Sequence, residues 1–396
     1  MLKYWIWLST RKGLGSRGIY QVARHFATPE QAYFAAAEEY DEVEGLRGAE
    51  GLLDKDLGQA EHILRRCYEK GISVLTLQDA AYPKRLLACY DPPVVLYYRG
   101  TLPDFDIPAI AVVGTRKASA YGMTQARRMG YGLARCGCAV ISGGARGIDT
   151  QALCGALTGG GPAVAVLGGG VDVVYPKENR SLFRDVEQNG CLVSEYPPGT
   201  EPYRNHFPVR NRIISALSLG VLVVEAPEKS GALITANRAL EQGRDVFVLP
   251  ANVGVESCSG NLKLLRDGAI PVRDAWDIVE EYEAQFPQTL SRQDLGTPEV
   301  GELVPQDHSG GEPEQKKAID KPKNKAYIDL NEIIDTLSRD EQCLANALQS
   351  GPLHIDQIVE QTQLSAGQAL ASLTLLEVKG IVRRPGARMY ELAEKI

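Results

Sequence analysis

The sequence lacks any apolar run long enough to cross a bilayer, for which about 20 residues are needed. The apolar patch at its start, MLKYWIWLS, is soon broken by Thr10, Arg11 and Lys12, and it is too short for the apolar part of a secretory signal. These absences exclude a membrane-spanning protein and indicate one that stays inside the cell. We therefore expect a soluble, cytoplasmic protein with no membrane partner.

The sequence also lacks a metal-binding cysteine pattern. Its eight cysteines stand at positions 67, 89, 136, 138, 154, 191, 258 and 343, without a CxxC pair or a Cys/His cluster of zinc spacing. Several of them lie in apolar segments, where a free thiol packs as a small hydrophobic group. We expect reduced, buried cysteines, as is usual in the cytosol, and neither a bound metal nor a cofactor.

Negative charge is missing from one stretch of an otherwise acidic chain. The whole chain has 50 acidic and 43 basic residues, a formal net charge of −7, yet no Asp or Glu occurs between Ile107 and Ile148. The same stretch contains six basic residues: Arg116, Lys117, Arg127, Arg128, Arg135 and Arg146. Because nearby charges decide the local field, this stretch predicts a surface for an anionic ligand.

Short apolar runs alternate with amphipathic ones from about residue 107 to residue 282. The apolar runs are typical of buried parallel strands, and they are Ile110–Val113, Ala139–Ser142, Ala163–Leu167, Leu192–Glu195, Val221–Glu225 and Val246–Leu249. Helical patterns lie between them, for example over residues 120–135 and over Leu233–Gln242. The alternation predicts an α/β protein with a Rossmann-like, doubly wound parallel sheet.

A helical region is expected before the sheet, and two additional strands are expected at the sheet's edge. Residues 1–75 predict a small N-terminal helical domain. Two of its helices joined by a glycine turn suggest a helix-hairpin-helix unit that holds a phosphate, although glycine-capped helices that only pack together fit equally well. The sheet domain is expected to span residues 76–285, with two strands from residues 72–100 added at its edge.

The last part of the chain changes character twice. Residues 286–328 are rich in Pro, Gly, Gln and charge, which predicts a flexible linker. Residues 329–396 recover helical periodicity. We expect three helices, at Ser338–Leu348, Ile355–Thr362 and Ser365–Lys379, followed by a hairpin around Pro385–Gly386. Three helices and a hairpin are the pattern of a C-terminal winged helix.

Ligands of an open parallel sheet bind beyond the carboxyl ends of its strands. In this sequence those ends carry many glycines and cations, a composition suited to phosphates. The candidate binding residues at this rim are Gly114, Arg116, Gly143, Gly144, Arg146, Lys177, Arg204, Phe207 and Arg210. Arg116 is the most informative of them, since packing poorly explains a flexible cation at a strand end.

The segment YRNHFPVRNRIISALS mixes rings with cations: Tyr203, Arg204, Phe207, Arg210 and Arg212. Cations that follow a backbone, together with rings on which bases stack, are what single-stranded nucleic acid needs. A purely structural alternative is that Phe207 caps the core and Arg212 pairs with Glu225 or Asp172. For Arg210 and Arg212, which are expected to open a helix, the two interpretations are equally favoured.

The usual motifs of nucleotide enzymes are missing. There is no GxGxxG after the first strand and no GxxxxGK[ST] anywhere. The turn GGARG could bring the amides of Gly143 and Gly144 to a phosphate, or it could serve only as a tight turn. No His lies near a plausible Ser or Cys partner, and no carboxylate pair has metal spacing. We therefore expect binding and not catalysis. The alternative is a Rossmann-type nucleotide-processing enzyme resembling phosphoribohydrolases, whose PGGxGTxxE motif is replaced here by LGGGVDVVYP.

Eight motifs resemble those of the DNA-processing protein A (DprA/Smf) family: VVGTRKAS, ISGGARGID, VDVVYPKENRSL, SEYPPGTEP, HFPVRNRIISALS, VVEAPEKSGALITA, ALEQGRDVFVLP and GNLKLLRDGA. The resemblance covers essentially the whole chain. It implies a homodimer that binds single-stranded DNA without base specificity and protects incoming DNA in natural transformation. It also implies loading of the RecA recombinase, with relief of inhibition by single-strand-binding protein.

The same resemblance assigns roles to particular residues. Arg116 and Lys177 match the family's principal basic DNA contacts, and its pocket and stacking segment correspond to Gly143, Arg146, Arg204 and Phe207. The N-terminal helices resemble the family's sterile-alpha-motif-like or helix-hairpin-helix extension.

The expected third helix of the C-terminal domain is poor in cations. AGQALASLTLLEVK has no basic residue before Lys379, and the hairpin adds only Arg383, Arg384 and Arg388. A strong reader of the major groove usually carries more basic residues. We interpret this domain as a weak DNA contact or a protein-interaction module.

Overall fold

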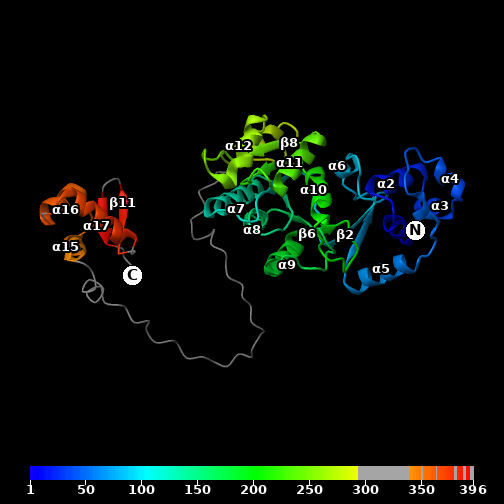
Figure 1. The fold of residues 1–396 in the computed structure, drawn as a ribbon, viewed down its shortest axis with the longest axis horizontal. Coiled ribbons are helices and arrows are strands. Elements are labelled where there is room, and N and C mark those ends of the chain that lie inside the picture. Colours follow the sequence, from blue (N-terminus) through cyan, green and yellow to red (C-terminus); the bar gives the residue numbers. More distant parts are fainter. Residues whose placement is uncertain (293–338, 349–350, 363, 379–380, 387–388, 393–396) are drawn as a thin grey trace, which may run out of the picture. The chain divides into compact units, whose positions relative to one another are not determined.

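The computed structural model describes residues 1–292, 339–348, 351–362, 364–378, 381–386 and 389–392. The chain divides into two compact units, Met1–Ser309 and Gly310–Ile396. The first contains the N-terminal helices and a large sheet, and the second contains a small three-stranded sheet with helices (Figure 1). Most of the predicted linker, residues 293–328, lies outside the described residues.

A nine-stranded sheet with the order β1-β2-β6-β5-β4-β3-β7-β8-β9 forms the centre of the first unit. Its strands are β1 (Ser73–Thr76), β2 (Val95–Gly100), β3 (Ala109–Val113), β4 (Ala139–Ser142), β5 (Ala163–Val166), β6 (Gly190–Ser194), β7 (Gly220–Val223), β8 (Asp245–Val248) and β9 (Ile270–Pro271). Strands β3 to β9 are parallel, and β1 and β2 are added antiparallel beside β6. The chain runs outward from β3 through β4, β5 and β6, then returns to β7 on the other side of β3. The predicted doubly wound sheet is confirmed, with the two expected strands at its edge.

Alternating side chains of the strands pack into two separate cores. In β3, Ile110 and Val112 belong to one cluster of buried residues, whereas Ala109, Ala111 and Val113 belong to the other. Because successive side chains of a strand point to opposite faces, both faces must be covered.

Helices cover both faces of the sheet (Figure 1). One face carries α7 (Ala120–Arg135), α8 (Ile148–Thr158), α9 (Arg180–Asn189) and α13 (Trp276–Val279). The opposite face carries α6 (Lys84–Leu87), α10 (His206–Leu217), α11 (Gly231–Glu241) and α12 (Ser259–Arg266). Short 3₁₀ turns lie at η2 (Lys177–Asn179), η3 (Glu256–Cys258) and η4 (Glu280–Tyr282).

Helices α7 and α8 touch backbone to backbone. A Cβ on Gly130 would lie 2.1 Å from the carbonyl oxygen of Ala152, and a Cβ on Gly155 would lie 2.1 Å from that of Arg127. No residue with a side chain fits at such distances without displacing the facing helix. The two glycines therefore fix these helices relative to each other, and with them the loops that precede each helix.

The N-terminal helices share the core of the sheet. They are α1 (Leu2–Ser9), α2 (Ser16–His25), α3 (Pro29–Phe34), α4 (Ala37–Asp41), η1 (Ala49–Leu53) and α5 (Gly58–Glu69). Trp7, Tyr40 and Leu52 are fully buried among them, in the same cluster that contains Tyr97 of β2. The described residues that follow the sheet also pack onto it. Leu290, which the composition placed in a linker, is 4% exposed, because its apolar side chain joins this cluster.

The second unit is a winged helix. It consists of α15 (Arg339–Ala347), β10 (Leu353–His354), α16 (Ile355–Thr362), α17 (Ala366–Val378), β11 (Val382–Gly386) and β12 (Met389–Leu392). The strands pair in the order β10-β12-β11 over a core that includes Leu344, Ile358 and Leu373. The three predicted helices and the hairpin are confirmed. Pro385 and Gly386, however, end β11 instead of forming the turn.

Within the described residues, no group of three or more His, Cys, Asp or Glu side chains is placed to hold a metal ion. None of the described helices has both the length and the apolar character of a membrane span. The cysteines are unpaired thiols, and all are buried except Cys154, which is intermediate, and Cys343, which is exposed.

Candidate nucleic-acid interface

The point where the strand order reverses lies between β3 and β7. Ligands of such sheets bind in the crevice outside the carboxyl ends of these strands. Here the two strand ends are tied together, because the Thr115 N–H donates to the carbonyl oxygen of Glu225 at 2.7 Å. Gly114 precedes this contact, and a Cβ on it would lie 2.4 Å from Cγ1 of Ile148. Glycine at 114 therefore lets the loop after β3 pass close to α8.

A carboxylate of the chain itself occupies the start of α7. Glu225 is 1% exposed, and its Oε2 accepts hydrogen bonds from the Ser119 N–H at 3.1 Å and from the Ser119 hydroxyl at 2.8 Å. A Cβ on Gly122 would lie 1.8 Å from the same oxygen. Helix N-termini at this position commonly hold a nucleotide phosphate. Glu225 fills that place and leaves no room there for one.

A second buried carboxylate, Asp149, faces the glycine turn after β4. Its Oδ2 accepts the Ala145 N–H at 3.3 Å. Burial raises the pKa of Asp149, and the nearby guanidinium of Arg210 opposes this shift. Burial also lowers the pKa of Arg210 to about 10, against the attraction of Asp149. The amide of Ala145, which follows the two glycines of this turn, thus donates to Asp149 of the chain itself.

Arg210 lies beneath the rim and not on its surface. It is 4% exposed, and a Cβ on Gly143 would lie 1.7 Å from its Nη1. Gly143 therefore leaves space for the buried guanidinium, and it is itself buried. Gly144 has φ of +64°, a conformation that favours glycine. These two glycines shape the turn more than they expose its amides.

Phe207 brings two arginines together at the rim. Its ring centroid is 4.8 Å from Cζ of Arg116 and 5.8 Å from Cζ of Arg210. The sequence placed Arg210 at the start of this helix, but α10 begins earlier, at His206, so Phe207 lies in its first turn. Pro208 does not interrupt the helix, because proline is tolerated in the first turn. Arg116 is exposed, so a cation and an aromatic face are presented side by side.

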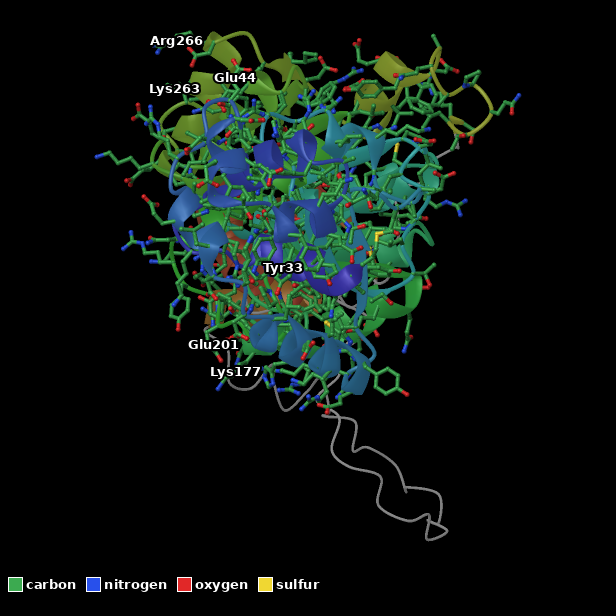
Figure 2. The ribbon with its side chains drawn as sticks, turned by 90° about the vertical axis from the view of Figure 1, so that its right-hand side faces the viewer. Tyr33, Glu44, Lys177, Glu201, Lys263 and Arg266 are labelled. Atoms are coloured by element: carbon green, nitrogen blue, oxygen red, sulfur yellow. The ribbon has the colours of Figure 1, made fainter. Side chains whose placement is uncertain are left out.

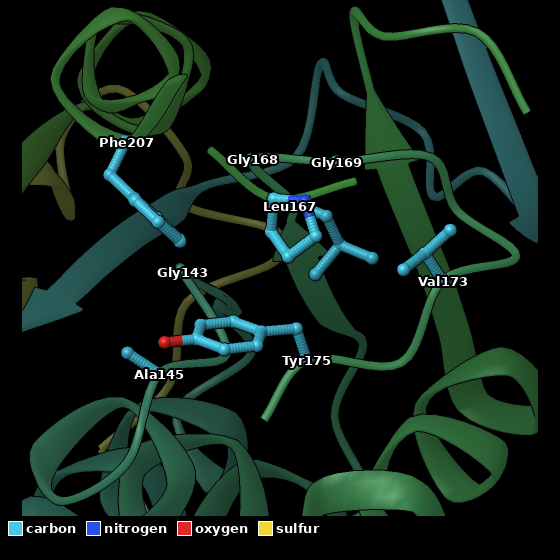
Figure 3. Close-up of a pocket in the computed structure, with 9 residues that line it drawn as sticks. Gly143, Ala145, Leu167, Gly168, Gly169, Val173, Tyr175 and Phe207 are labelled. Carbon is cyan, nitrogen blue, oxygen red and sulfur yellow. The ribbon is translucent and has the colours of Figure 1, made fainter. Parts of the chain in front are cut away.

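A pocket opens beside Phe207 (Figure 3). It is lined by Gly143, Ala145, Leu167, Gly168, Gly169, Val173, Tyr175, Pro202 and Phe207. The ring centroids of Tyr175 and Phe207 are 5.8 Å apart with an interplanar angle of 44°, and Tyr175 is 43% exposed. A Cβ on Gly168 would lie 3.1 Å from Cδ1 of Phe207, so the absence of a side chain at position 168 leaves room for the ring. Sequence reasoning missed Tyr175, although its place two residues before Lys177 was a usable signal.

The loop after β5 carries Lys177 and is anchored to the glycine turn after β4. The Asn179 side-chain amide donates to the carbonyl oxygen of Gly144 at 2.9 Å. Arg146, on that turn, pairs with Glu178 at 2.6 Å. Lys177 is exposed and extends from the surface (Figure 2). The structure thus brings this loop to the turn that holds Gly143 and Gly144.

Three of the predicted cations are free to meet a ligand. Within the described residues, Arg116, Lys177 and Arg204 are exposed and have no ion-pair partner. Arg204 lies in the exposed segment before α10, three residues from Phe207. Arg146, by contrast, already shares its charge with Glu178.

Arg212 has a structural role, but not with the partners suggested by the sequence. It is 5% exposed and pairs with Asp91 at 3.2 Å and Glu195 at 2.7 Å, so pairing with Glu225 or Asp172 was wrong. The rim histidine, His206, is also structural. Its Nδ1 donates to the carbonyl oxygen of Gly168 at 2.9 Å, and its ring stacks on Tyr196 with centroids 4.0 Å apart.

Comparison with known proteins identifies the family. Residues 73–283 match the model of DNA recombination-mediator protein A, and residues 331–387 match that of the DprA winged helix domain. Protein Smf from Synechocystis sp. is 35% identical over 396 residues, which cover 97% of each chain. DNA processing protein DprA from Streptococcus pneumoniae is 36% identical over 280 residues, 71% of this chain and 98% of its own length. The X-ray structure of DNA processing protein A from Streptococcus pneumoniae matches with a TM-score of 0.64 and 34% identity, again covering 71% of this chain and 98% of its own. The chain therefore belongs to the DNA recombination-mediator protein A family.

Proposed function

We propose that this protein binds single-stranded DNA, without base specificity and without catalysis, at the rim that carries Arg116, Lys177, Arg204, Phe207 and Tyr175. The observation that carries the proposal is the position of the exposed Arg116 guanidinium, 4.8 Å from the Phe207 ring and without an ion-pair partner among the described residues. A cation for a phosphate and a ring for a base at one place are what an unpaired strand needs.

The remaining candidate residues support this surface from below or beside it. Gly114, Gly143 and Gly144 let their loops pass close to the side chains of Ile148, Arg210 and Phe183, respectively. We assign Arg210 a positioning role, since its buried guanidinium lies 5.8 Å from the Phe207 ring centroid and is attracted by the charge of Asp149. We assign Arg146, with Glu178, an auxiliary role beside Lys177.

The alternative of a nucleotide-processing enzyme is less compatible with the site. Such an enzyme needs free amides at a helix N-terminus for the substrate phosphate. Here Glu225 takes the hydrogen bonds of Ser119 at the start of α7, and Asp149 takes that of Ala145 before α8. The groups left to meet a ligand are exposed side chains, which suits a polymer held from outside.

We further propose that the bound strand is handed to the RecA recombinase, that this relieves inhibition by single-strand-binding protein, and that the protein acts in the cytoplasm as a homodimer during natural transformation. This proposal is supported by the family to which the chain belongs, recombination-mediator protein A. Its test is RecA filament formation on DNA coated with single-strand-binding protein, with and without this protein. An unchanged rate of filament formation would remove the loading step and leave DNA binding untouched.

The decisive experiment for binding is the salt dependence of affinity for oligo-dT. Arg116→Ala and Lys177→Ala should each weaken binding and lower the slope of log K against log salt by about 0.7, because each removes one phosphate contact. Lys263→Ala is the matched control, since Lys263 is also exposed and Figure 2 shows it at the opposite edge from Lys177. Unchanged slopes for both rim variants, or an equal loss for Lys263→Ala, would remove the rim as the binding site. Duplex DNA of equal length should bind more weakly.

A further inference from the structure

The N-terminal helices hold the two loops that carry the candidate interface. At the end of α5, Nη2 of Arg66 lies 3.5 Å from Oδ2 of Asp172, and Lys70 pairs with the same oxygen. The other oxygen of Asp172, Oδ1, accepts the Gly199 N–H at 2.7 Å. The Asp172 side chain, 6% exposed, thus joins three segments: α5, the loop after β5 and residues 195–205 before α10.

Residues 195–205 are held closely from two sides. Gly199 has φ of +78°, and a Cβ on it would lie 2.2 Å from Nη2 of Arg66, so the guanidinium rests directly on this backbone. On the other side, the Gly170 N–H donates to the carbonyl oxygen of Thr200 at 2.9 Å. Residues 195–205 are therefore fixed between α5 and the glycines that follow β5, two of which, Gly168 and Gly169, line the pocket.

Helix α2 makes a second connection to the same segment. Nη2 of Arg212 donates to the Ser16 hydroxyl at 3.1 Å and also holds Glu195, the first residue of the segment. Next to it, the Arg17 guanidinium stacks on Tyr90, 4.1 Å from the ring centroid. The N-terminal helices thus reach both the start and the middle of the segment that leads to Phe207.

We propose that Asp172 is a positioning residue for single-stranded DNA binding. Through it, the N-terminal helices set the distance between the loop that carries Tyr175 and Lys177 and residues 195–205, which lead to Phe207. The proposal rests on the proposed DNA-binding function. Burial opposes the charged form of Asp172, but the hydrogen bonds from Lys70 and the Gly199 N–H outweigh it and lower the pKa of this carboxyl. Asp172 is therefore an anion close to a surface that binds a polyanion.

Because Asp172 is negatively charged, the direction in which Asp172→Asn changes DNA affinity tests the proposal. If Asp172 acted only through its charge, Asp172→Asn would remove a repulsion and tighten DNA binding. If it positions the loops, the same variant weakens binding although the rim becomes more positive. We expect affinity of the full chain for oligo-dT to fall by about fivefold to twentyfold. The slope against salt should stay unchanged, because no phosphate contact is lost.

Two further variants complete the test. Glu201→Gln is the matched control, since it removes an exposed negative charge from residues 195–205, and Glu201 has no ion-pair partner within the described residues. Its affinity should equal that of the wild type or exceed it by up to about threefold. Asp172→Glu keeps the charge but displaces the carboxylate by one methylene, and it should also weaken binding. This variant decides the question if Asp172→Asn fails to fold. Hydrogen exchange should show faster exchange at Gly199 in both Asp172 variants, with the central strands unchanged.

The outcomes separate this proposal from the function on which it rests. A wild-type chain that does not bind oligo-dT overturns the DNA-binding function itself, and the positioning role with it. A wild type that binds, together with folded Asp172 variants that bind equally well or more tightly, overturns the positioning role alone.

Discussion

Phe207 is the side chain on which the rim's contacts converge. Its ring packs against Gly168 and lies near the side chains of Tyr175, Arg116 and Arg210. If a base stacks on it, Phe207→Ala should weaken oligo-dT binding by about 1–3 kcal/mol without changing the salt slope. Fluorescence anisotropy at several salt concentrations measures both quantities.

Phe207→Leu and Phe207→Trp are the controls for this prediction. Leucine keeps an apolar group over Gly168 but offers no ring, so it should lose nearly as much affinity as alanine. Tryptophan keeps a stacking face and should retain binding. Wild-type affinity of Phe207→Leu would show that Phe207 only fills the pocket.

At this scale the sequence predicted which residues gather, but not what each one pairs with. Arg116 and Phe207 were both expected at the rim, because strand ends and aromatic–cation mixtures are local signals. The buried partners were not visible: Arg210 faces Asp149, and Arg212 holds Glu195. Such pairs join residues from different elements, and only the packed fold decides which carboxylate meets which arginine.

Among the elements of secondary structure, helices α7 and α8 pack in close backbone contact at Gly130. Gly130→Ala would place a Cβ 2.1 Å from a carbonyl oxygen of α8, so the helices must separate. We expect a loss of about 1–3 kcal/mol in the free energy of unfolding, which urea denaturation measures. Gly231→Ala, at the start of α11, is the control. No heavy atom lies within 4 Å of its Cβ position, so it should be neutral or stabilising. Equal midpoints for the two variants would contradict this packing argument.

The elements themselves were largely predictable. Each apolar β-branched run between residues 107 and 282 that was expected to be a strand is one, because a strand buried on both faces has an unmistakable composition. Strand ends moved by one or two residues, as at β6, which begins at Gly190 and not at Leu192. The sequence predicted a doubly wound sheet but not the order of its strands, which depends on how whole elements pack and not on any single residue.

At the scale of the whole molecule, the chain is acidic but has one locally basic surface, the rim. The winged helix itself contains few basic residues. Helix α17 contains no Lys or Arg, and it exposes Leu370 and Leu375. On the hairpin, Arg383 pairs with Glu391 at 2.6 Å. This composition agrees with the expectation that the winged helix is a weak DNA contact or a protein-interaction module.

Removal of residues 333–396 should therefore leave most oligo-dT binding intact. Because affinity for a polyanion depends on the number of cations that meet phosphates, we expect a change within about threefold and the same salt slope. Lys177→Ala in the shortened chain is the internal control, and it should weaken binding as much as in the full chain. Loss of binding on truncation, with the sheet still folded by circular dichroism, would move the DNA site from the rim to the winged helix.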